Sequence, residues 1–323
     1  MNWLRRLFGR SSDTPPNGIA PAAPAVEPLA ATVTASPPPV PLQTRPLSPV
    51  DGGTRPLPPD PLPEITTSEH ITFAQATDVG MVRSNNQDAV LSFFCATRSV
   101  DERPDFGLFA VADGMGGHHD GEKASSLTVR TLLAEVTTTL FLPLVTGAPE
   151  AGDTPISEIL VSAVLKSNGA VIRQVPDGGT TLTAVTIIGD LAYVSHVGDS
   201  RVYYITGDRI EQVTRDHSLV QRLIELDQLT PAEAADHPQK NVLYRALGQT
   251  ETLEVDVLTR RLPPHSRLLL CSDGLWNLIE ERELREIVMK NVSPQLACDQ
   301  LIALANSRGG VDNITAILLH IPG

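Results

Sequence analysis

The stretch Phe109-Ala-Val-Ala-Asp-Gly-Met-Gly-Gly117 is an apolar run that ends in an Asp-Gly pair. Such a run predicts a buried strand, and the Asp-Gly pair predicts that the strand stops at the edge of a sheet. The carboxylate of Asp113 is then delivered to that edge, where Gly114 allows another backbone to come close. A single junction of this kind is more often an ordinary turn than a functional site.

Three further junctions of the same type follow later in the chain. Asp199, Asp273 and Asp312 each stand beside an apolar run, and a glycine adjoins the first two of them. If these strand ends meet in space, their carboxylates repel one another unless a cation neutralises them. Carboxylate and carbonyl oxygens suit Mg²⁺ or Mn²⁺, and no His/Cys cluster has the spacing of a zinc site. The residues therefore predict a site for a hard divalent metal.

The pattern along the rest of the chain predicts an α+β fold. Consecutive strands are expected to pair as hairpins, for example across Gly189-Asp190 and across Gly198-Asp199. The helices come in separate groups, which favours antiparallel sheets covered by helices over a βαβ repeat. The strands are expected at residues 71–76, 89–95, 108–112, 182–188, 191–196, 201–205, 253–260, 267–271 and 314–321. The helices are expected at residues 122–140, 156–174, 218–226, 281–289 and 294–306.

The composition of the chain excludes several classes of protein. The 323 residues carry a formal net charge of −13, most of it in residues 70–323, and clustered Lys and Arg for binding nucleic acid are missing. Three scattered cysteines, Cys95, Cys271 and Cys298, do not form a disulfide framework and suit a reducing, cytoplasmic compartment. No run approaches 18 consecutive apolar residues, so we expect a soluble domain without a transmembrane segment.

Residues 1–69 differ from the rest, because they hold 16 of the 27 prolines and few large apolar side chains. Proline fixes φ and removes an N–H group, so this leader is expected to be a disordered, partly polyproline-II tether. Residues 1–10 place Trp3 and Phe8 opposite three arginines on a short helix. That pattern suits contact with a membrane surface or a partner, and a frayed tail is the alternative.

Eight motifs together resemble the metal-dependent Ser/Thr protein phosphatases of the PPM (protein phosphatase 2C) family in their compact bacterial form. The resemblance covers about residues 71–321, and the motifs occur in family order. Any one of them is weak, but the ordered set is highly specific. They are Thr77-Asp-Val-Gly-Met-Val-Arg-Ser-Asn-Asn-Gln-Asp88, Asp113-Gly-Met-Gly-Gly-His118, Gly178-Gly-Thr-Thr181, Val197-Gly-Asp-Ser-Arg201, Asp216-His-Ser-Leu-Val220, Arg245-Ala-Leu-Gly248, Ser272-Asp-Gly-Leu-Trp276 and Gly310-Val-Asp-Asn-Ile-Thr315.

The resemblance implies a two-sheet antiparallel β-sandwich flanked by helix pairs (α-β-β-α) in residues 70–323, with a flap at about residues 213–248. It also implies two core metal ions, Mn²⁺ or Mg²⁺, and a third, weaker ion. The implied metal-site residues are Asp113 as the bridge between the core ions, the Gly114 carbonyl on one, Asp273 and Asp312 on the other, Asp88 beside metal-bound waters, and Asp199 with Asp273 on the third.

For catalysis, the resemblance implies that Arg83 clamps the substrate phosphate and that a metal-bridging hydroxide hydrolyses phosphoserine or phosphothreonine without a phosphoenzyme. Two departures from the family stand out. Gln87 replaces a common Glu, which predicts weaker metal binding. Met115 replaces the histidine proposed as general acid in eukaryotic relatives, and His118 is a candidate substitute, with a metal-bound water as the alternative.

The implied partners are phosphorylated proteins and a Ser/Thr kinase that the enzyme opposes, and a monomer is expected. A partner-switching phosphatase of a single regulatory phosphoprotein and a phosphoprotein-binding pseudophosphatase stay open as alternatives. The flap is expected to select substrates or to be a purely structural insert. His196 is expected to be a hydrogen-bonded core histidine, and Trp276 a core residue that holds the loop after Asp273.

Overall fold

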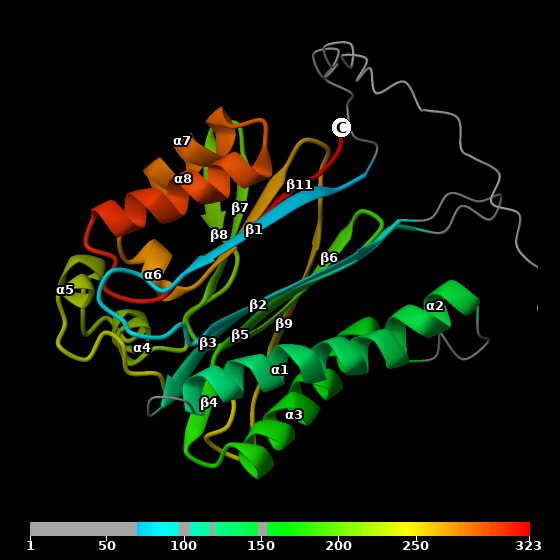
Figure 1. Cartoon of the computed structure of the whole chain (residues 1–323), viewed down its shortest axis with the longest axis horizontal. Helices are drawn as coiled ribbons and strands as arrows, with labels where there is room; N and C mark the ends of the chain where they lie inside the picture. The colour runs from blue at the N-terminus through cyan, green and yellow to red at the C-terminus, as the bar shows by residue number, and fades with distance from the viewer. Residues whose placement is uncertain (1–69, 97–103, 117–119, 148–153) are drawn as a thin grey trace, which may run out of the picture. The chain divides into compact units, whose positions relative to one another are not determined.

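The computed structural model describes residues 70–96, 104–116, 120–147 and 154–323. Two antiparallel sheets lie face to face in this part of the chain, and helices cover the outer face of each sheet (Figure 1). This confirms the predicted α-β-β-α sandwich. The predictions for residues 1–69 and for His118 lie outside the described residues.

The first sheet has the strand order β1-β11-β10-β7-β8. Its central strand is β10, and β11 beside it pairs with β1 from Thr72↔His320 to Asp78↔Ile314 and so joins the two ends of the described chain. The strands are β1 (Thr72–Asp78), β7 (Arg201–Thr206), β8 (Arg209–Gln212), β10 (Arg267–Cys271) and β11 (Ile314–His320).

The second sheet has the order β2-β3-β5-β6-β9, and the short β4 pairs with the end of β3. In the pairing of β2 with β3, Asp88 lies opposite Asp113, so two of the predicted site residues are cross-strand neighbours. The strands are β2 (Asp88–Cys95), β3 (Phe106–Gly116), β4 (Gly178–Thr180), β5 (Leu182–Ile188), β6 (Leu191–Val197) and β9 (Asp256–Arg261).

The period-2 alternation of the strands builds the layers of the core. On β3, Phe109 and Val111 point between the sheets, whereas Leu108 and Ala110 point toward the helices. All four side chains are fully buried. Because β3 is covered on both faces, it reads as a continuous apolar run in the sequence rather than as an alternating one.

Helices α1 and α3 pack on the second sheet, and α7 and α8 pack on the first (Figure 1). The short helices α4 and α5 lie in the predicted flap, and α6 begins at the predicted metal ligand Asp273. The helices are α1 (Asp120–Val136), the π-helix η1 (Thr137–Phe141), α2 (Leu142–Thr146), α3 (Ile156–Gln174), α4 (Leu219–Glu225), α5 (Pro231–Ala235), α6 (Asp273–Trp276), α7 (Glu281–Lys290) and α8 (Pro294–Ser307).

The continuous helical run from α1 to α2, Asp120–Thr146, is long and apolar enough to cross a membrane by length and composition alone. Its buried residues, which include Val129, Leu132 and Val136, pack with β3 and α3 in one core cluster. Packing on the sheet therefore accounts for the apolar face of α1, whereas no residue of α2 is buried, and Leu142 and Val145 are exposed there.

One predicted hairpin is wrong. The strands either side of Gly189-Asp190 do pair, but β6 and β7, either side of Gly198-Asp199, belong to different sheets. Gly198 has a φ of 114°, a conformation that favours glycine, and the chain crosses there from one sheet to the other. Asp199 consequently lies where the two sheets come together, which is closer to the other site residues than a hairpin tip would be.

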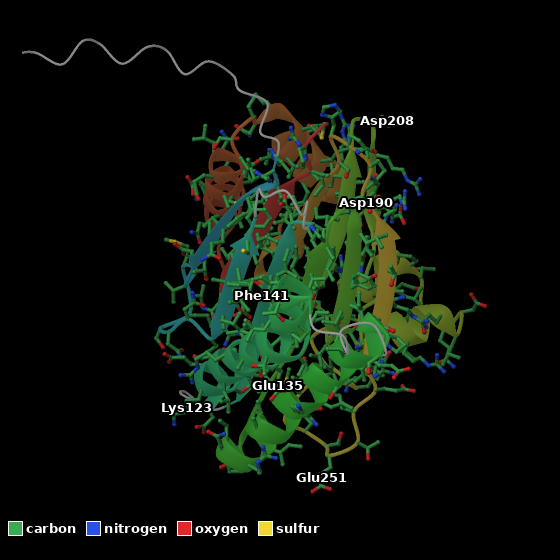
Figure 2. All side chains as sticks on the ribbon, turned by 90° about the vertical axis from the view of Figure 1, so that its right-hand side faces the viewer. Lys123, Glu135, Phe141, Asp190, Asp208 and Glu251 are labelled. Carbon is green, nitrogen blue, oxygen red and sulfur yellow. The ribbon has the colours of Figure 1, made fainter. Side chains whose placement is uncertain are left out.

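The turns of the sandwich mark its two ends. In Figure 2, Asp190 and Asp208 label the β5–β6 and β7–β8 turns toward the top, and Lys123 labels the start of α1 toward the bottom. The predicted site residues lie at the lower end, because α1 follows Asp113 closely in the chain and β3 runs toward it.

Candidate active site

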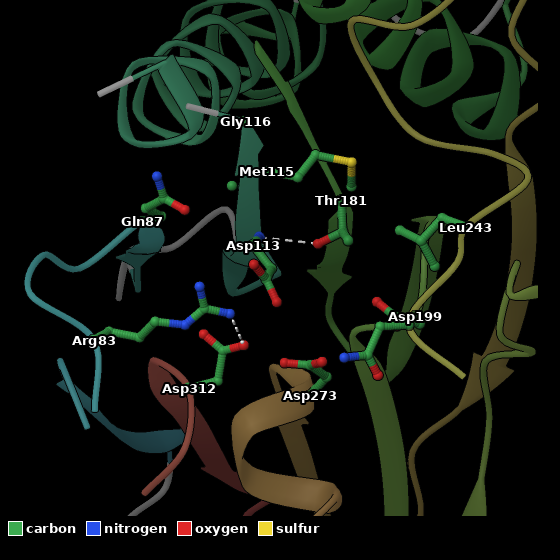
Figure 3. A pocket seen from close by; sticks show the side chains of 12 residues that line it. Arg83, Gln87, Asp113, Met115, Gly116, Thr181, Asp199, Leu243, Asp273 and Asp312 are labelled. Carbon is green, nitrogen blue, oxygen red and sulfur yellow. Dashed lines mark hydrogen bonds and ion pairs between the residues drawn. The ribbon is translucent and has the colours of Figure 1, made fainter. Parts of the chain in front are cut away.

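The predicted carboxylates gather around one pocket of about 230 Å³ at this end of the sandwich (Figure 3). Asp113 comes from the end of β3, Asp199 from the crossover after β6, Asp273 from the start of α6, and Asp312 from the loop before β11. The strand ends meet at the same end of the sandwich, which is the condition on which the predicted metal site depended. The pocket is also lined by Arg83, Gln87, Gly114, Met115, Gly116, Thr181, Asn241 and Leu243.

Asp88 lies behind the pocket wall rather than on it. It is the cross-strand neighbour of Asp113, and its Oδ2 accepts a hydrogen bond of 2.7 Å from the Ser272 hydroxyl. The same hydroxyl accepts the backbone N–H of Thr315 at 3.0 Å. Ser272 therefore connects β2, β10 and β11, and it fixes the direction in which Asp88 points.

Asp113 is held from the opposite side by Thr181. The Thr181 hydroxyl accepts the backbone N–H of Asp113 at 2.9 Å, and the Thr181 N–H donates to the Asp113 carbonyl at 2.8 Å. At Gly114, a Cβ atom would collide with the backbone of Gly121 and with the Gln87 carbonyl. Only glycine fits at this point, so the glycine of the Asp-Gly pair has a steric reason.

Asp199 is positioned through its backbone. The Trp276 indole N–H donates to the Asp199 carbonyl at 3.0 Å, and the Arg201 guanidinium lies 3.5 Å from the centre of the indole ring. Arg201 in turn pairs with Asp216 at 2.7 Å. Trp276 is half-buried rather than a core residue. Through these two contacts it joins α6, which follows Asp273, to the segment that contains Asp199 and Arg201.

Asn313 joins the loops that carry the other site residues. Its side-chain amide donates to the carbonyls of Val79 and Asn85 at 2.9 Å, and its Oδ1 accepts the N–H of Gln87 at 2.8 Å. This arrangement fixes residues 79–87 against the loop that contains Asp312. Arg83 projects from this segment over the pocket and pairs with Asp312 at 2.6 Å (Figure 3).

Gln87 occupies the position of the common family glutamate. It lines the pocket, and its side-chain amide packs closely against Gly121 at the start of α1. It contributes no negative charge to the pocket. The structure thus leaves the four lining carboxylates and Asp88 as the acidic groups of the site.

The clustering perturbs the ionisation of these groups strongly. Burial, followed by repulsion from the neighbouring carboxylates, raises the pKa of Asp113 and that of Asp199 well above the usual range. Burial also raises the pKa of Asp88 to about 6 and that of Asp273, which faces Asp312, to about 7. Carboxylates held together in this way favour a positive partner, because a cation removes the repulsion that raises their pKa values.

The donor set fits a hard divalent cation. Oδ1 of Asp88 and Oδ1 of Asp273 are buried and have no hydrogen-bond partner in the described structure. Buried polar atoms without partners are rare, and a bound ion is one recognised explanation for them. Among the described residues, no three His, Cys, Asp or Glu side chains stand in a ready-made ligand arrangement. A hard cation bound here would therefore take carbonyl oxygens and water molecules as ligands beside the carboxylates.

The two buried thiols do not take part in this site. Burial raises the pKa of Cys271 and that of Cys298 to about 12, so neither is a thiolate at neutral pH. His196 behaves as predicted: it is buried, its ring contacts the Thr183 hydroxyl at 2.9 Å and the Arg215 carbonyl at 3.0 Å, and burial lowers its pKa to about 3.

Comparison with known proteins identifies the family. The family model described as protein phosphatase 2C matches residues 82–305, which is more than half of the chain. The chain belongs to the protein phosphatase 2C family. This confirms the family and the enzyme class, a protein serine/threonine phosphatase, that the ordered motifs predicted.

Bacterial members of the family are similar over most of their length. A putative protein phosphatase 2C-type protein of Streptococcus pyogenes is 37% identical over 249 residues, covering 76% of this chain and 95% of that protein. The serine/threonine phosphatase stp of Listeria innocua is 36% identical over 244 residues, covering 76% of this chain and 93% of that protein.

Solved structures of family members share the fold of this phosphatase. The serine/threonine phosphatase PstP/Ppp of Mycobacterium tuberculosis has a TM-score of 0.65 and 32% identity, and the match covers 78% of this chain and 99% of that one. The catalytic domain of PstP has also been solved with two manganese ions, with a TM-score of 0.62 and 30% identity over 78% of this chain and 99% of that one. Family phosphatases are metal-dependent, which agrees with the donor set of this pocket.

The sequence predicted the carboxylates of the site but missed the residues that hold them. Thr181 and Asn313 stood within quoted motifs without a role, and Ser272 precedes Asp273 directly. Their proximity to Asp-Gly and Asp-Asn junctions was the available signal. Asn241 and Leu243 of the flap also line the pocket, and no local sequence pattern predicts this position for them.

Proposed function

We propose that this phosphatase removes phosphate from phosphoserine and phosphothreonine on proteins and that divalent cations, Mn²⁺ or Mg²⁺, support the reaction at the carboxylate pocket. The observation that carries the proposal is the convergence of Asp113, Asp199, Asp273 and Asp312 beneath one exposed arginine. A cluster of acids alone repels a phosphate dianion, so the acids require cations and the arginine to make the pocket attractive to it.

The residues divide this work between them. Asp113, the Gly114 carbonyl, Asp273 and Asp312 would hold two core ions, with Asp88 close by, and Asp199 with Asp273 would hold a third, weaker one. Bound divalent ions supply charge neutralisation at the phosphoryl oxygens and lower the pKa of a water molecule. Gln87 leaves the site one carboxylate short of the common family pattern, which supports weaker binding of the ions.

Arg83 would orient the phosphate. Its planar guanidinium offers paired N–H donors, and its side chain is 52% exposed at the mouth of the pocket. Its present partner is Asp312, so a phosphate would share or replace that ion pair. His118, proposed to protonate the leaving alcohol, lies outside the described residues and stays a prediction, as does a water in that role.

The buried, protonated thiols support direct hydrolysis without a cysteine phosphoenzyme. We also propose that residues 70–323 form the phosphatase domain behind a leader of residues 1–69, and that the enzyme works in the cytoplasm against a Ser/Thr kinase. Three free cysteines support a reducing compartment. A monomeric state, contact of residues 1–10 with a membrane and the lack of nucleic-acid binding stay predictions.

The test is phosphate release from p-nitrophenyl phosphate and from a phosphothreonine peptide. We expect activity with Mn²⁺ or Mg²⁺, none in EDTA, and a loss of at least about 100-fold in Asp113→Asn. Asp208→Asn is the matched control, because Asp208 is an exposed aspartate in the β7–β8 turn (Figure 2). Full activity in EDTA, or in Asp113→Asn, would contradict the proposal.

A further inference from the structure

Three large apolar side chains are exposed in the two loop segments that contain Arg83 and Asp312. Met81 is 69% exposed, Val82 is 68% exposed and Val311 is 54% exposed. Met81 and Val82 directly precede the arginine, and Val311 directly precedes Asp312, the ion-pair partner of the arginine. We call these three residues the apolar rim. Each of them is more than half exposed, so packing in the core does not account for their apolar character.

The apolar rim is held in place by backbone contacts. The Met81 N–H donates to the Gly310 carbonyl at 2.7 Å, which ties the two halves of the rim together. Gly80 has a φ of 81°, and a Cβ there would collide with the Asp312 carbonyl. The Gly80 N–H in turn donates to the Asp78 carboxylate at 2.8 Å. The rim is thus a preorganised surface whose position relative to Arg83 is fixed, and a preorganised surface loses little entropy when it binds.

The position of the rim relative to Arg83 indicates which part of a substrate it binds. A phosphate bound at Arg83 places the residues on either side of the phosphorylated one within a few ångströms, since consecutive Cα atoms are about 3.8 Å apart. Across the pocket the flap contributes another apolar side chain, Leu243. An acidic neighbour in the substrate would meet the carboxylates of the pocket, whereas an apolar neighbour removes rim surface from water.

We propose that the apolar rim binds an apolar side chain that adjoins the phosphorylated residue of a protein substrate. The inference rests on the proposed function, and it adds a sequence preference to it: phosphoserine or phosphothreonine flanked by a large aliphatic residue. The rim residues flank Arg83 and Asp312 in the chain, and these two residues line the pocket, so we expect one peptide to engage both the rim and the pocket. The rim therefore discriminates between substrates that present the same phosphate.

The test compares two phosphothreonine peptides, Ala-Gly-Leu-pThr-Leu-Gly-Ala and the same peptide with Ser in place of both Leu residues, at a saturating Mn²⁺ concentration. We expect kcat/KM to be about tenfold higher for the leucine peptide. In the triple variant Met81→Gln, Val82→Thr, Val311→Thr, which keeps the side-chain shapes, the preference should fall to about twofold, mainly through KM.

Val292→Thr is the matched control. Val292 is 79% exposed, and it follows Asn291, whose carbonyl accepts from Arg267 at the start of β10, the end of that strand away from the pocket. This control should keep the tenfold preference. Equal rates on both peptides in the wild type, or an undiminished preference in the triple variant, overturns the inference while leaving the proposed function intact. Failure to hydrolyse p-nitrophenyl phosphate and both peptides contradicts the proposed function, and the inference falls with it.

Discussion

Arg83 is expected to contribute to phosphate binding but little to the stability of the fold. Its ion pair with Asp312 is half exposed, and exposed pairs contribute at most about 1 kcal/mol to stability. We therefore expect Arg83→Ala to leave the urea midpoint nearly unchanged. The same variant should raise KM for p-nitrophenyl phosphate about 10- to 100-fold, because a charged hydrogen-bond donor to phosphate is lost.

The comparison for Arg83→Ala is Arg282→Ala, which removes an exposed ion pair with Glu286 on α7. Steady-state kinetics with the metal concentration held constant separate the two variants. An unchanged KM in Arg83→Ala would show that the guanidinium does not hold the phosphate.

Ser272 is the opposite case, a buried residue that holds the site together. It donates to Asp88 and accepts from Thr315, so Ser272→Ala removes one hydrogen bond from a buried carboxylate and one from a buried N–H group. We expect the free energy of unfolding to fall by about 1–3 kcal/mol in metal-free buffer, measured by urea denaturation. Ser307→Ala, which removes an exposed hydroxyl on α8, should cost less than about 0.5 kcal/mol. Equal effects of the two changes would refute this role for Ser272.

The predictability of the site follows the chemistry of its residues. Asp113 and Asp273 could be predicted because a charged residue directly after an apolar run is conspicuous. The sequence did not reveal the roles of Thr181, Ser272 and Asn313. The role of a small polar residue depends on its hydrogen-bond partner, and the local sequence does not show that partner. Those partners lie as much as 234 positions away, as in the bond from Asn313 to Val79.

At the scale of elements, long periodic segments were predicted well and short ones were missed. The strands Leu182–Ile188 and Arg267–Cys271 and the helix Ile156–Gln174 match the expected bounds. The three-residue β4 and the four-residue β8 and α6 carry too few residues to show a period. The crossover from β6 to β7 depends on which sheet each strand joins, and local turn residues do not determine that.

The loop between β1 and β2 offers a test of element packing. Gly80 combines a positive φ with a backbone contact to Asp312, so Gly80→Ala strains the loop and pushes against the next one. We expect a loss of about 2 kcal/mol or more in the free energy of unfolding, together with weaker Mn²⁺ binding. Gly207→Ala is the matched control, since a Cβ at Gly207 meets nothing within 4 Å. Similar stability of both variants would contradict the packing described for this loop.

At the scale of the whole molecule, a buried histidine links stability to pH. Burial lowers the pKa of His196 from 6.5 to about 3, so between these values the unfolded chain binds a proton that the folded chain does not. The free energy of unfolding should therefore fall as the pH drops below 6.5, by about 2 kcal/mol at pH 5 from this residue. Asp88 and Asp273 act in the opposite direction, because their raised pKa values favour the folded state at low pH.

Urea denaturation at pH 5 and at pH 7.5, in EDTA, isolates the contribution of His196. Lowering the pH from 7.5 to 5 should reduce the free energy of unfolding of the wild type by about 2 kcal/mol relative to its effect on His196→Asn. The same pH dependence in both proteins would mean that the pKa of His196 is the same in the folded and the unfolded chain, which contradicts the lowered value.

The net charge of −13 becomes meaningful once the carboxylates are located. Five of them, Asp88, Asp113, Asp199, Asp273 and Asp312, are concentrated at one end of the sandwich, where a phosphorylated substrate would have to approach. Bound cations would offset this local charge, so we expect the pocket to bind divalent ions before it binds phosphate.

The most direct measurement is calorimetric titration of the metal-stripped protein with Mn²⁺ at pH 7.5. We expect two core ions per wild-type chain, nearly complete loss of binding in Asp113→Asn, and unchanged binding in Asp208→Asn. Absence of binding by the wild type, or wild-type binding by Asp113→Asn, would contradict the assignment of this carboxylate pocket as the metal centre.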